Sequence, residues 1–428
     1  MALGTAAAVD QFRTAFPGKV VTPEVKPKYQ GAVTRPWSQT CWTPAAGYVY
    51  LSNVQELTEA LAIVKKTGSK FAIRKTGHNP NAGFSSADET AIVLDIRHRS
   101  SWIGKYLGEV YAWLEEQKLS AIGGRDQQVG LGGFLLGGGM GVLPNLHGLG
   151  ADGVRNFEVL LADGRLINTN ANENANLHRV LKGGGFNYSI VTRFDLETHP
   201  LINVQYTINL YSPDDHVEIN KATVAVQKAM EDDPKTGLFT KLCCCGLALW
   251  RPQQSHLLLL SLSIILKAWR AVCSVTTQVS QELYEEVYKS WTEVCKTLPA
   301  GCVLHYTIQP MGKAGVEAGK DRGENIMGHE SIPQCWWVFT CEWPQEGSDD
   351  AVAQQAVNKM SETVHSLARE AGLLLDFECM SFSMASQRVL GSYGAENIKR
   401  MQEAAAKYDP EGVFQKLQYG GFLLRNNV

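Results

Sequence analysis

The side chains best suited to chemistry lie together in one short turn, Arg74-Lys75-Thr76-Gly77-His78. The turn follows an apolar run at residues 71–73, which predicts a short β-strand. Gly77 has no Cβ, so the backbone N–H groups around it are accessible. Such N–H groups and the neighbouring cationic side chains can bind a phosphate, and the His78 imidazole can lie against a cofactor. The alternative is an ordinary surface loop that contains a histidine.

A second segment, residues 129–141, is dominated by glycine: Val-Gly-Leu-Gly-Gly-Phe-Leu-Leu-Gly-Gly-Gly-Met-Gly. Each glycine costs a helix about 1 kcal/mol relative to alanine, so we expect no stable helix here. Such a backbone can instead approach a flat, bulky ligand closely, and tight packing of a glycine-rich loop is the alternative. Residues 148–153 match the nucleotide-binding pattern G-x-G-x-x-G, but they precede a predicted strand at 154–161. That motif should follow a strand and open a helix, so we exclude a Rossmann-type site.

The turn at Arg74–His78 resembles the Arg-Ser-Gly-Gly-His turn of the berberine-bridge-enzyme-like flavoproteins, which belong to the vanillyl-alcohol-oxidase superfamily and have a PCMH-type FAD domain. The continuation Gly-His-Asn-Pro-Asn-Ala-Gly-Phe at 77–84 is similar to fungal FAD-linked oxidoreductases, many from secondary-metabolite pathways. In this family the histidine carries the flavin through its 8α carbon. The resemblance therefore implies FAD as the cofactor, covalently bound to His78. Lys75 and Thr76 stand where Ser-Gly is usual.

The same resemblance implies which other residues contact FAD. The glycine segment would lie along the pyrophosphate and the ring edge, and residues 184–191 resemble the closing Gly-Gly-x-x-Asn-Phe-Gly-Ile-Val motif, with Ser189 in place of glycine. Some relatives have a second flavin link from a cysteine, but the matching position here is Asp126, whose carboxylate cannot form a thioether. A single link through His78 is therefore expected. The implied cofactor-binding residues are Arg74, Lys75, Thr76, Gly77, His78, Asn79, Val129, Gly130, Gly132, Gly133, Gly138, Gly139, Asp152, Val154, Ile190 and Val191.

The elements around these motifs alternate between helix and strand. Apolar residues at helical spacing predict a helix over 54–67 that Gly68 ends, followed by strands at 71–73 and 91–96 and a helix ending near Gln117. Asp163-Gly164 predicts a hairpin between 157–161 and 165–167. A helix at 172–181 and a strand at 188–194 follow. The family normally has a pair of strands between Asp95 and the next helix, where this chain has only a short bridge.

The pattern changes after residue 200. Strands at 204–210 and 335–341 are separated by long helical segments, the clearest at 350–370, as expected for a substrate-covering domain. Residues 242–279, with clustered cysteines and a leucine run, have little resemblance to the family, whereas residues 408–422 resemble its closing segment. We therefore predict an α+β protein. It comprises a two-part PCMH-type FAD-binding domain (38–199), a substrate domain with an antiparallel sheet covered by helices (200–399), and a C-terminal segment (400–428) that returns to the FAD domain.

The bulk composition excludes several classes of protein. The chain has 428 residues, 44% hydrophobic and 19% charged, which suits a globular protein with two cores. A net charge of −3 with scattered basic residues argues against nucleic acid or a membrane surface as a partner. The most hydrophobic run, 257–266, is shorter than the roughly 20 residues of a membrane helix. No secretion signal is recognisable, so we expect an intracellular protein with free thiols and no metal site.

The resemblance implies an FAD-linked oxidoreductase acting on a small secondary-metabolite-type substrate, with hydride transfer to flavin N5. Electrons would then pass to oxygen or another acceptor. Leu131 is a bulky residue at a position that affects oxygen access in the family, so both an oxidase and a dehydrogenase stay open. The alternative function is a non-redox scaffold of the same fold, such as a pericyclase or isomerase, or an inactive shortened member. No catalytic base is identified, because each candidate also suits a structural role: Tyr206, Tyr306, Gln309, Gln387 and His147.

Overall fold

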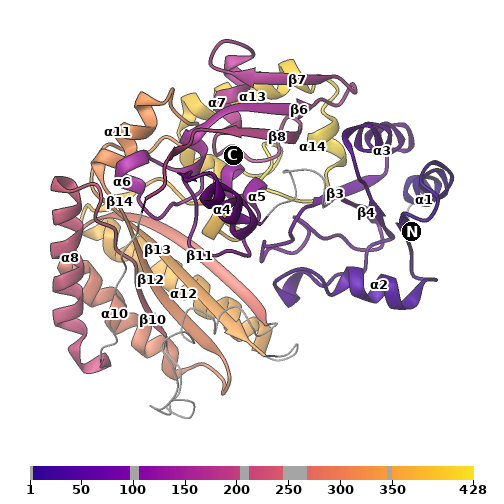
Figure 1. Cartoon of the computed structure of the whole chain (residues 1–428). Coiled ribbons are helices and arrows are strands. Elements are labelled where there is room, and N and C mark those ends of the chain that lie inside the picture. Colours follow the sequence, from indigo (N-terminus) through magenta and orange to yellow (C-terminus); the bar gives the residue numbers. More distant parts are fainter. Residues whose placement is uncertain (1–2, 97–105, 203–211, 244–267, 345–348) are drawn as a thin grey trace.

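The computed structural model describes residues 3–96, 106–202, 212–243, 268–344 and 349–428 (Figure 1). The strand predicted at 204–210, with Tyr206, and the hydrophobic run at 257–266 lie outside the described residues. So does most of the short bridge that follows Asp95.

The first sheet carries the histidine turn at the end of one of its strands. Its strands are ordered β1-β2-β4-β3, and β2, β4 and β3 are parallel. The predicted helix at 54–67 is confirmed: the Asn53 side chain caps it by accepting from the Glu56 N–H, and Gly68 ends it with φ +65°. The α1 helix, which precedes residue 38, packs against α3 through a shared apolar cluster. The elements are α1 (Leu3–Ala15), β1 (Val20–Val21), α2 (Lys26–Val33), β2 (Gly47–Tyr50), α3 (Val54–Thr67), β3 (Lys70–Arg74) and β4 (Ala91–Asp95).

The second sheet is antiparallel, in the order β7-β6-β8. It confirms the predicted hairpin, because β6 pairs with β7 across the Asp163-Gly164 turn. A 3₁₀ turn at Gly150–Gly153 leads into β6, so the G-x-G-x-x-G match does precede a strand. The elements are α4 (Leu107–Glu116), β5 (Leu119–Ser120), α5 (Leu131–Leu136), α6 (Pro144–His147), β6 (Val154–Leu160), β7 (Leu166–Asn170), α7 (Ala175–Leu181), β8 (Ile190–Leu196) and β9 (His199–Pro200).

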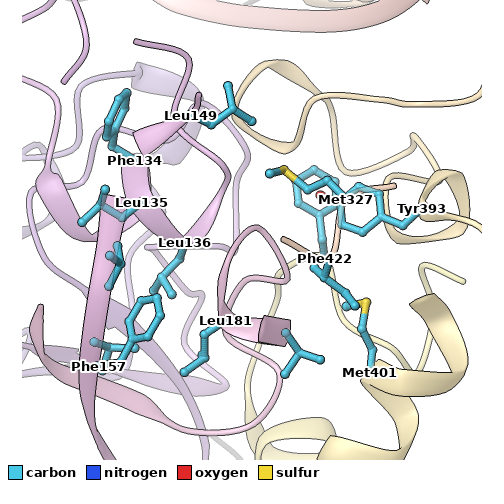
Figure 2. Close-up of a cluster of buried hydrophobic side chains, with 14 of the residues drawn as sticks. Phe134, Leu135, Leu136, Leu149, Phe157, Leu181, Met327, Tyr393, Met401 and Phe422 are labelled. Atoms are coloured by element: carbon cyan, nitrogen blue, oxygen red, sulfur yellow. The ribbon is translucent and has the colours of Figure 1, made fainter. Parts of the chain in front are cut away.

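The expectation that the glycine segment forms no helix is wrong for its first part. The short helix α5 contains Gly132 and Gly133. Packing overrides the low helix propensity, because Leu135 and Leu136 of this helix are fully buried in the core that Figure 2 shows. The second part of the segment does leave helical geometry, with φ +98° at Gly138 and +79° at Gly139.

The third sheet confirms the predicted antiparallel sheet with a helical cover. Its order is β10-β12-β13-β11-β14, and α8, α10 and α12 lie against one face (Figure 1). Side chains alternate along each strand, so the other face of this sheet is directed away from these helices. The elements are α8 (His216–Asp232), β10 (Thr240–Cys243), β11 (Trp269–Gln278), α10 (Gln281–Lys296), β12 (Val303–Met311), α11 (Lys313–Asp321), β13 (Gln334–Trp343), α12 (Asp349–Glu370) and β14 (Leu374–Leu375).

The last segment, with α13 (Ala395–Tyr408) and α14 (Val413–Leu417), returns to the first two sheets. The Tyr419 N–H donates to the Phe71 carbonyl at 2.7 Å, and Gln415 donates to the side chain of Asn187 at 2.9 Å. Met401 and Phe422 of this segment lie with Met327 in the apolar core that also contains Leu135 and Leu136 of α5 (Figure 2). The domain boundaries themselves stay predictions. No helix in the described ranges combines the length and apolar character needed to span a bilayer.

Candidate functional site

His78 follows β3 in a turn that the N-terminal segment holds from one side. Gly77 has φ +78°, which is accessible to glycine at low cost, and its carbonyl accepts from the Trp37 N–H at 3.1 Å. The Trp37 ring stacks on the His78 imidazole, with centroids 4.5 Å apart and planes 13° from parallel. The side chain of His78 stays 17% exposed, so one part of the ring is accessible while the stack fixes its plane.

The charges around His78 come from two sides. On one side, Asp126 Oδ2 lies 3.9 Å from His78 Nε2. On the other, the guanidinium of Arg270 lies over the ring of Trp37, 3.9 Å from its centroid. Desolvation lowers the pKa of His78 to about 4, with Asp126 raising it and Arg270 lowering it further. The imidazole is therefore neutral, and able to act as a nucleophile, at neutral pH.

The loop after His78 is tied to the substrate domain. The Cys41 thiol donates to the Asn79 carbonyl at 3.0 Å, and the Asn79 side chain accepts from the Asn81 N–H at 2.8 Å. The Asn81 amide in turn donates to the Ser383 carbonyl and accepts from the Ala385 N–H, both at 2.9 Å. These bonds leave the histidine loop little freedom to move.

Arg74 is directed away from His78, into a buried polar group beneath the turn. Its Nε donates to Asp95 at 3.1 Å, its Nη1 donates to the Ala32 carbonyl at 2.8 Å, and its guanidinium lies 4.8 Å from the ring centroid of Tyr48. Arg35 also pairs with Asp95. The Arg74 side chain is 1% exposed, so in this structure it supports the turn from within.

Lys75 and Thr76 extend toward the glycine segment. A Cβ on Gly130 would lie 2.2 Å from Thr76 Oγ1, and one on Gly132 would lie 2.7 Å from Lys75 Nζ, so a larger residue at either position would displace the facing side chain. Gly133 differs, since a Cβ there would have no atom within 4 Å. The histidine turn and the start of α5 are therefore adjacent, with Gly133 on an open side.

Lys75 is buried without an acidic partner among the described residues. Its ammonium donates to the Val191 carbonyl of β8 at 3.4 Å and lies 5.2 Å from the ring centroid of Phe194. Desolvation lowers its pKa to about 7. A buried ammonium of this kind is costly unless an anion compensates its charge.

The remaining predicted cofactor residues are spread more widely. Gly138 and Gly139 pack against Met327 and Phe134 in the apolar core. Asp152 is buried, which raises its pKa, and it accepts from the Leu149 N–H and from Asn325. Three apolar residues are buried in the sheets or beside them: Val154 and Ile190 fully, and Val129 partly.

A polar cluster on the third sheet was missed by the sequence interpretation. Arg270 of β11 donates to Glu342 of β13 at 2.8 Å, and His305 Nε2 of β12 lies 3.5 Å from the same carboxylate. Burial opposes ionisation of Glu342, but the nearby His305 ring and the charge of Arg270 lower its pKa to about 2. The available signal was strict alternation in β12, with Leu304, Tyr306 and Ile308 buried against the helices and polar residues between them.

A cleft of about 380 Å³ lies beside the histidine loop, between the FAD domain and α12. This volume is within the range of small-molecule sites. The described residues of the lining supply amide and hydroxyl groups and the Arg270 guanidinium, and no carboxylate. It consists of Thr40, Pro80, Asn81, Ala82, Arg270, Ala271, Val272, Gln354, Asn358, Met384, Ala385 and Ser386.

The described candidates for a catalytic base have structural partners. Tyr306 is fully buried on the helix side of the sheet and donates to the Tyr284 carbonyl. Gln387 bonds both backbone groups of Ser274. His147 stacks on His199, with centroids 3.9 Å apart, while Gln309 lies on the opposite face from Tyr306 and accepts from Arg125 at 3.2 Å.

Comparison with known proteins agrees with this arrangement. A family model described as an FAD binding domain matches residues 45–170. An FAD-dependent monooxygenase from Arthrobotrys oligospora is 30% identical over 430 residues, covering 90% of this chain and 84% of the relative. The FAD-dependent monooxygenase yanF from Aspergillus niger is 27% identical over 446 residues, covering 94% and 77%.

Solved structures share the fold at low sequence identity. Glucooligosaccharide oxidase from Acremonium strictum, described as containing 6-S-cysteinyl, 8α-N1-histidyl FAD, superposes with a TM-score of 0.74 at 16% identity. The match covers 95% of this chain and 97% of that one. The combination of sheets and covering helices found in this chain thus also occurs in the fold of this oxidase.

Proposed function

The chain belongs to the berberine-bridge-enzyme-like family of FAD-linked oxidoreductases, and from that premise we propose that it binds FAD covalently through His78 and oxidises a small secondary-metabolite-type molecule. When bound, the flavin would supply a hydride acceptor at N5 and pass the electrons to oxygen or another acceptor. The observation that carries the proposal is the position of a neutral, stacked imidazole in the turn that adjoins the glycine segment.

The residues present fit FAD. Its diphosphate would supply the anion that the buried ammonium of Lys75 lacks, and the N–H groups near the open side of Gly133 are suited to the same group. His78 would hold the flavin ring, with Trp37 fixing the imidazole plane. None of these roles needs Arg74 to leave its pairing with Asp95.

The polar cluster of Arg270, Glu342 and His305 would act on the substrate side. Glu342, ionised and paired with Arg270, is placed to hold a proton on His305 Nε2 or to accept one from it. Among the described residues, the lining of the nearby cleft carries the Arg270 guanidinium and no carboxylate, which favours a neutral or anionic substrate over a cationic one. The two fungal relatives are FAD-dependent monooxygenases, which supports oxidation of a small molecule as the reaction.

The decisive experiment compares wild type, His78→Ala and His147→Ala as purified proteins. After acid denaturation, intact mass should show one FAD adduct on wild type and on His147→Ala, and none on His78→Ala. His147 serves as the control because its ring stacks on another imidazole, His199, rather than on Trp37. Yellow protein that releases all its flavin on denaturation would refute the covalent link alone. Colourless, folded wild type would favour the non-redox scaffold.

A further inference from the structure

Asp126 lies where a second flavin link would come from in some relatives, and its carboxylate is directed toward His78. Oδ1 accepts from the Gln128 N–H at 2.8 Å, which fixes the carboxylate in an Asx turn. The other oxygen, Oδ2, lies 3.9 Å from His78 Nε2. The carboxylate thus presents its free oxygen to one particular nitrogen of the imidazole.

The two imidazole nitrogens have different surroundings. Nε2 is the nitrogen that has the Asp126 carboxylate within ion-pair distance. Trp37 covers one ring face and prevents the ring from tilting freely. In a neutral imidazole, a carboxylate beside one nitrogen favours the proton there and leaves the lone pair on the other.

We propose that Asp126 is the positioning residue for flavin attachment: it holds the proton of His78 on Nε2, so that Nδ1 forms the bond to the 8α carbon of FAD. This inference rests on the proposed covalent link. Bond formation between Nδ1 and the 8α carbon would break one 8α C–H bond and release two protons, one from that carbon and one from Nε2, and the Asp126 carboxylate would take up the Nε2 proton. The two electrons of the C–H bond would remain on the flavin until dioxygen takes up both electrons and both protons to give hydrogen peroxide.

The test compares wild type with Asp126→Asn, Asp126→Ala and the control Asp163→Asn. Asp163 has the same Asx-turn bond, to the Arg165 N–H at 3.0 Å, but lies in the β6–β7 turn. Total FAD is measured from the visible spectrum of each purified protein, and the covalent fraction from intact mass after acid denaturation. We expect both Asp126 variants to keep bound FAD while their covalent fraction falls at least tenfold, with no change in Asp163→Asn. The linked nitrogen of the wild type is identified by NMR of the flavin peptide and should be Nδ1.

Each other result overturns the inference in a recognisable way. Covalent fractions equal to wild type in both Asp126 variants would refute the role of Asp126 and leave the proposed function intact. Wild type with FAD but without an adduct would refute the covalent link itself, and the inference with it. If the Asp126 variants fail to fold, the wild-type peptide decides: attachment through Nε2 contradicts the proposal, and attachment through Nδ1 supports it.

Discussion

Replacing Lys75 with methionine tests two effects of its buried ammonium group: the destabilisation of the FAD-free protein and the binding of FAD. The substitution keeps the length of the side chain and removes the ammonium whose pKa burial lowers from 10.5 to about 7. In the unfolded chain the lysine binds its proton up to about pH 10.4, so between pH 7 and that value the unfolded state holds more protons than the folded one. Stability of the FAD-free protein should therefore rise with pH across this window.

The magnitude follows from the linkage relation. The charge costs the folded state at most about 4 kcal/mol at pH 7 and about 2 kcal/mol at pH 9. Losing the bond to the Val191 carbonyl offsets part of the gain from Lys75→Met, by about 1–3 kcal/mol, but does so equally at both pH values. The advantage of Lys75→Met over Lys75 should thus shrink by about 2 kcal/mol between pH 7 and pH 9.

The assay is urea unfolding at pH 7 and pH 9 of Lys75→Met and of the exposed control Lys66→Met, each in a His78→Ala background from which FAD can be removed. Flavin titration of the same proteins should show affinity at least tenfold weaker for Lys75→Met, because a bond to a charged group contributes about 1.5–3 kcal/mol. A stability difference that does not change with pH would refute the lowered pKa of Lys75, and unchanged FAD affinity would refute its assignment as the diphosphate's counter-ion.

Three further substitutions test the surroundings. Gly130→Ala brings a Cβ to 2.2 Å from Thr76 Oγ1, so the histidine turn must shift, and both the melting temperature and the FAD content of the purified protein should fall. In Gly133→Ala the added Cβ has no atom within 4 Å, so the FAD-free protein should gain about 0.5–1 kcal/mol of free energy of unfolding. Flavin titration should show weaker binding, and unchanged binding would place FAD elsewhere. Arg270→Met removes the guanidinium from the partly buried Glu342 and leaves it beside His305 alone, which should cost about 1.5–3 kcal/mol in urea unfolding at pH 7. It should also raise the pKa of Glu342 from about 2, so the loss should be smaller at pH 4, where that carboxyl can be protonated.

The sequence predicted helix ends and hairpin turns correctly where the residue type strongly favours one backbone conformation. Gly68 ends α3 in the left-handed conformation, and Asp163-Gly164 turns the β6–β7 hairpin, as their types require. The glycine segment could not be interpreted this way. Gly132 is needed because the side chain of Lys75 occupies the space where a Cβ would lie, and that contact joins residues far apart in sequence.

The histidine turn of the site was predicted from the sequence, whereas the polar cluster on the third sheet was not. The histidine turn was identified from five consecutive residues. The polar cluster of Arg270, His305 and Glu342 could not be, because it depends on how three separate strands pair. Glu342 lies opposite Arg270 on β11, and Thr340, two residues before it, lies opposite His305 on β12. Only the pairing of three strands, in the order β12-β13-β11, brings Arg270 and His305 to the carboxylate of Glu342.

The two cations of the histidine turn, Arg74 and Lys75, have different roles. From the sequence, Arg74 and Lys75 cannot be distinguished, since they are consecutive cations in the turn that contains Gly77. Side chains of consecutive strand residues point to opposite faces, however, so where β3 ends only one of them can reach the glycine segment. Asp95, the last residue of the neighbouring strand β4, is opposite Arg74 in register and engages it. The buried pair anchors the end of β3, while the next residue carries the uncompensated charge toward α5, so substitution of Arg74 should act on folding and substitution of Lys75 on the cofactor.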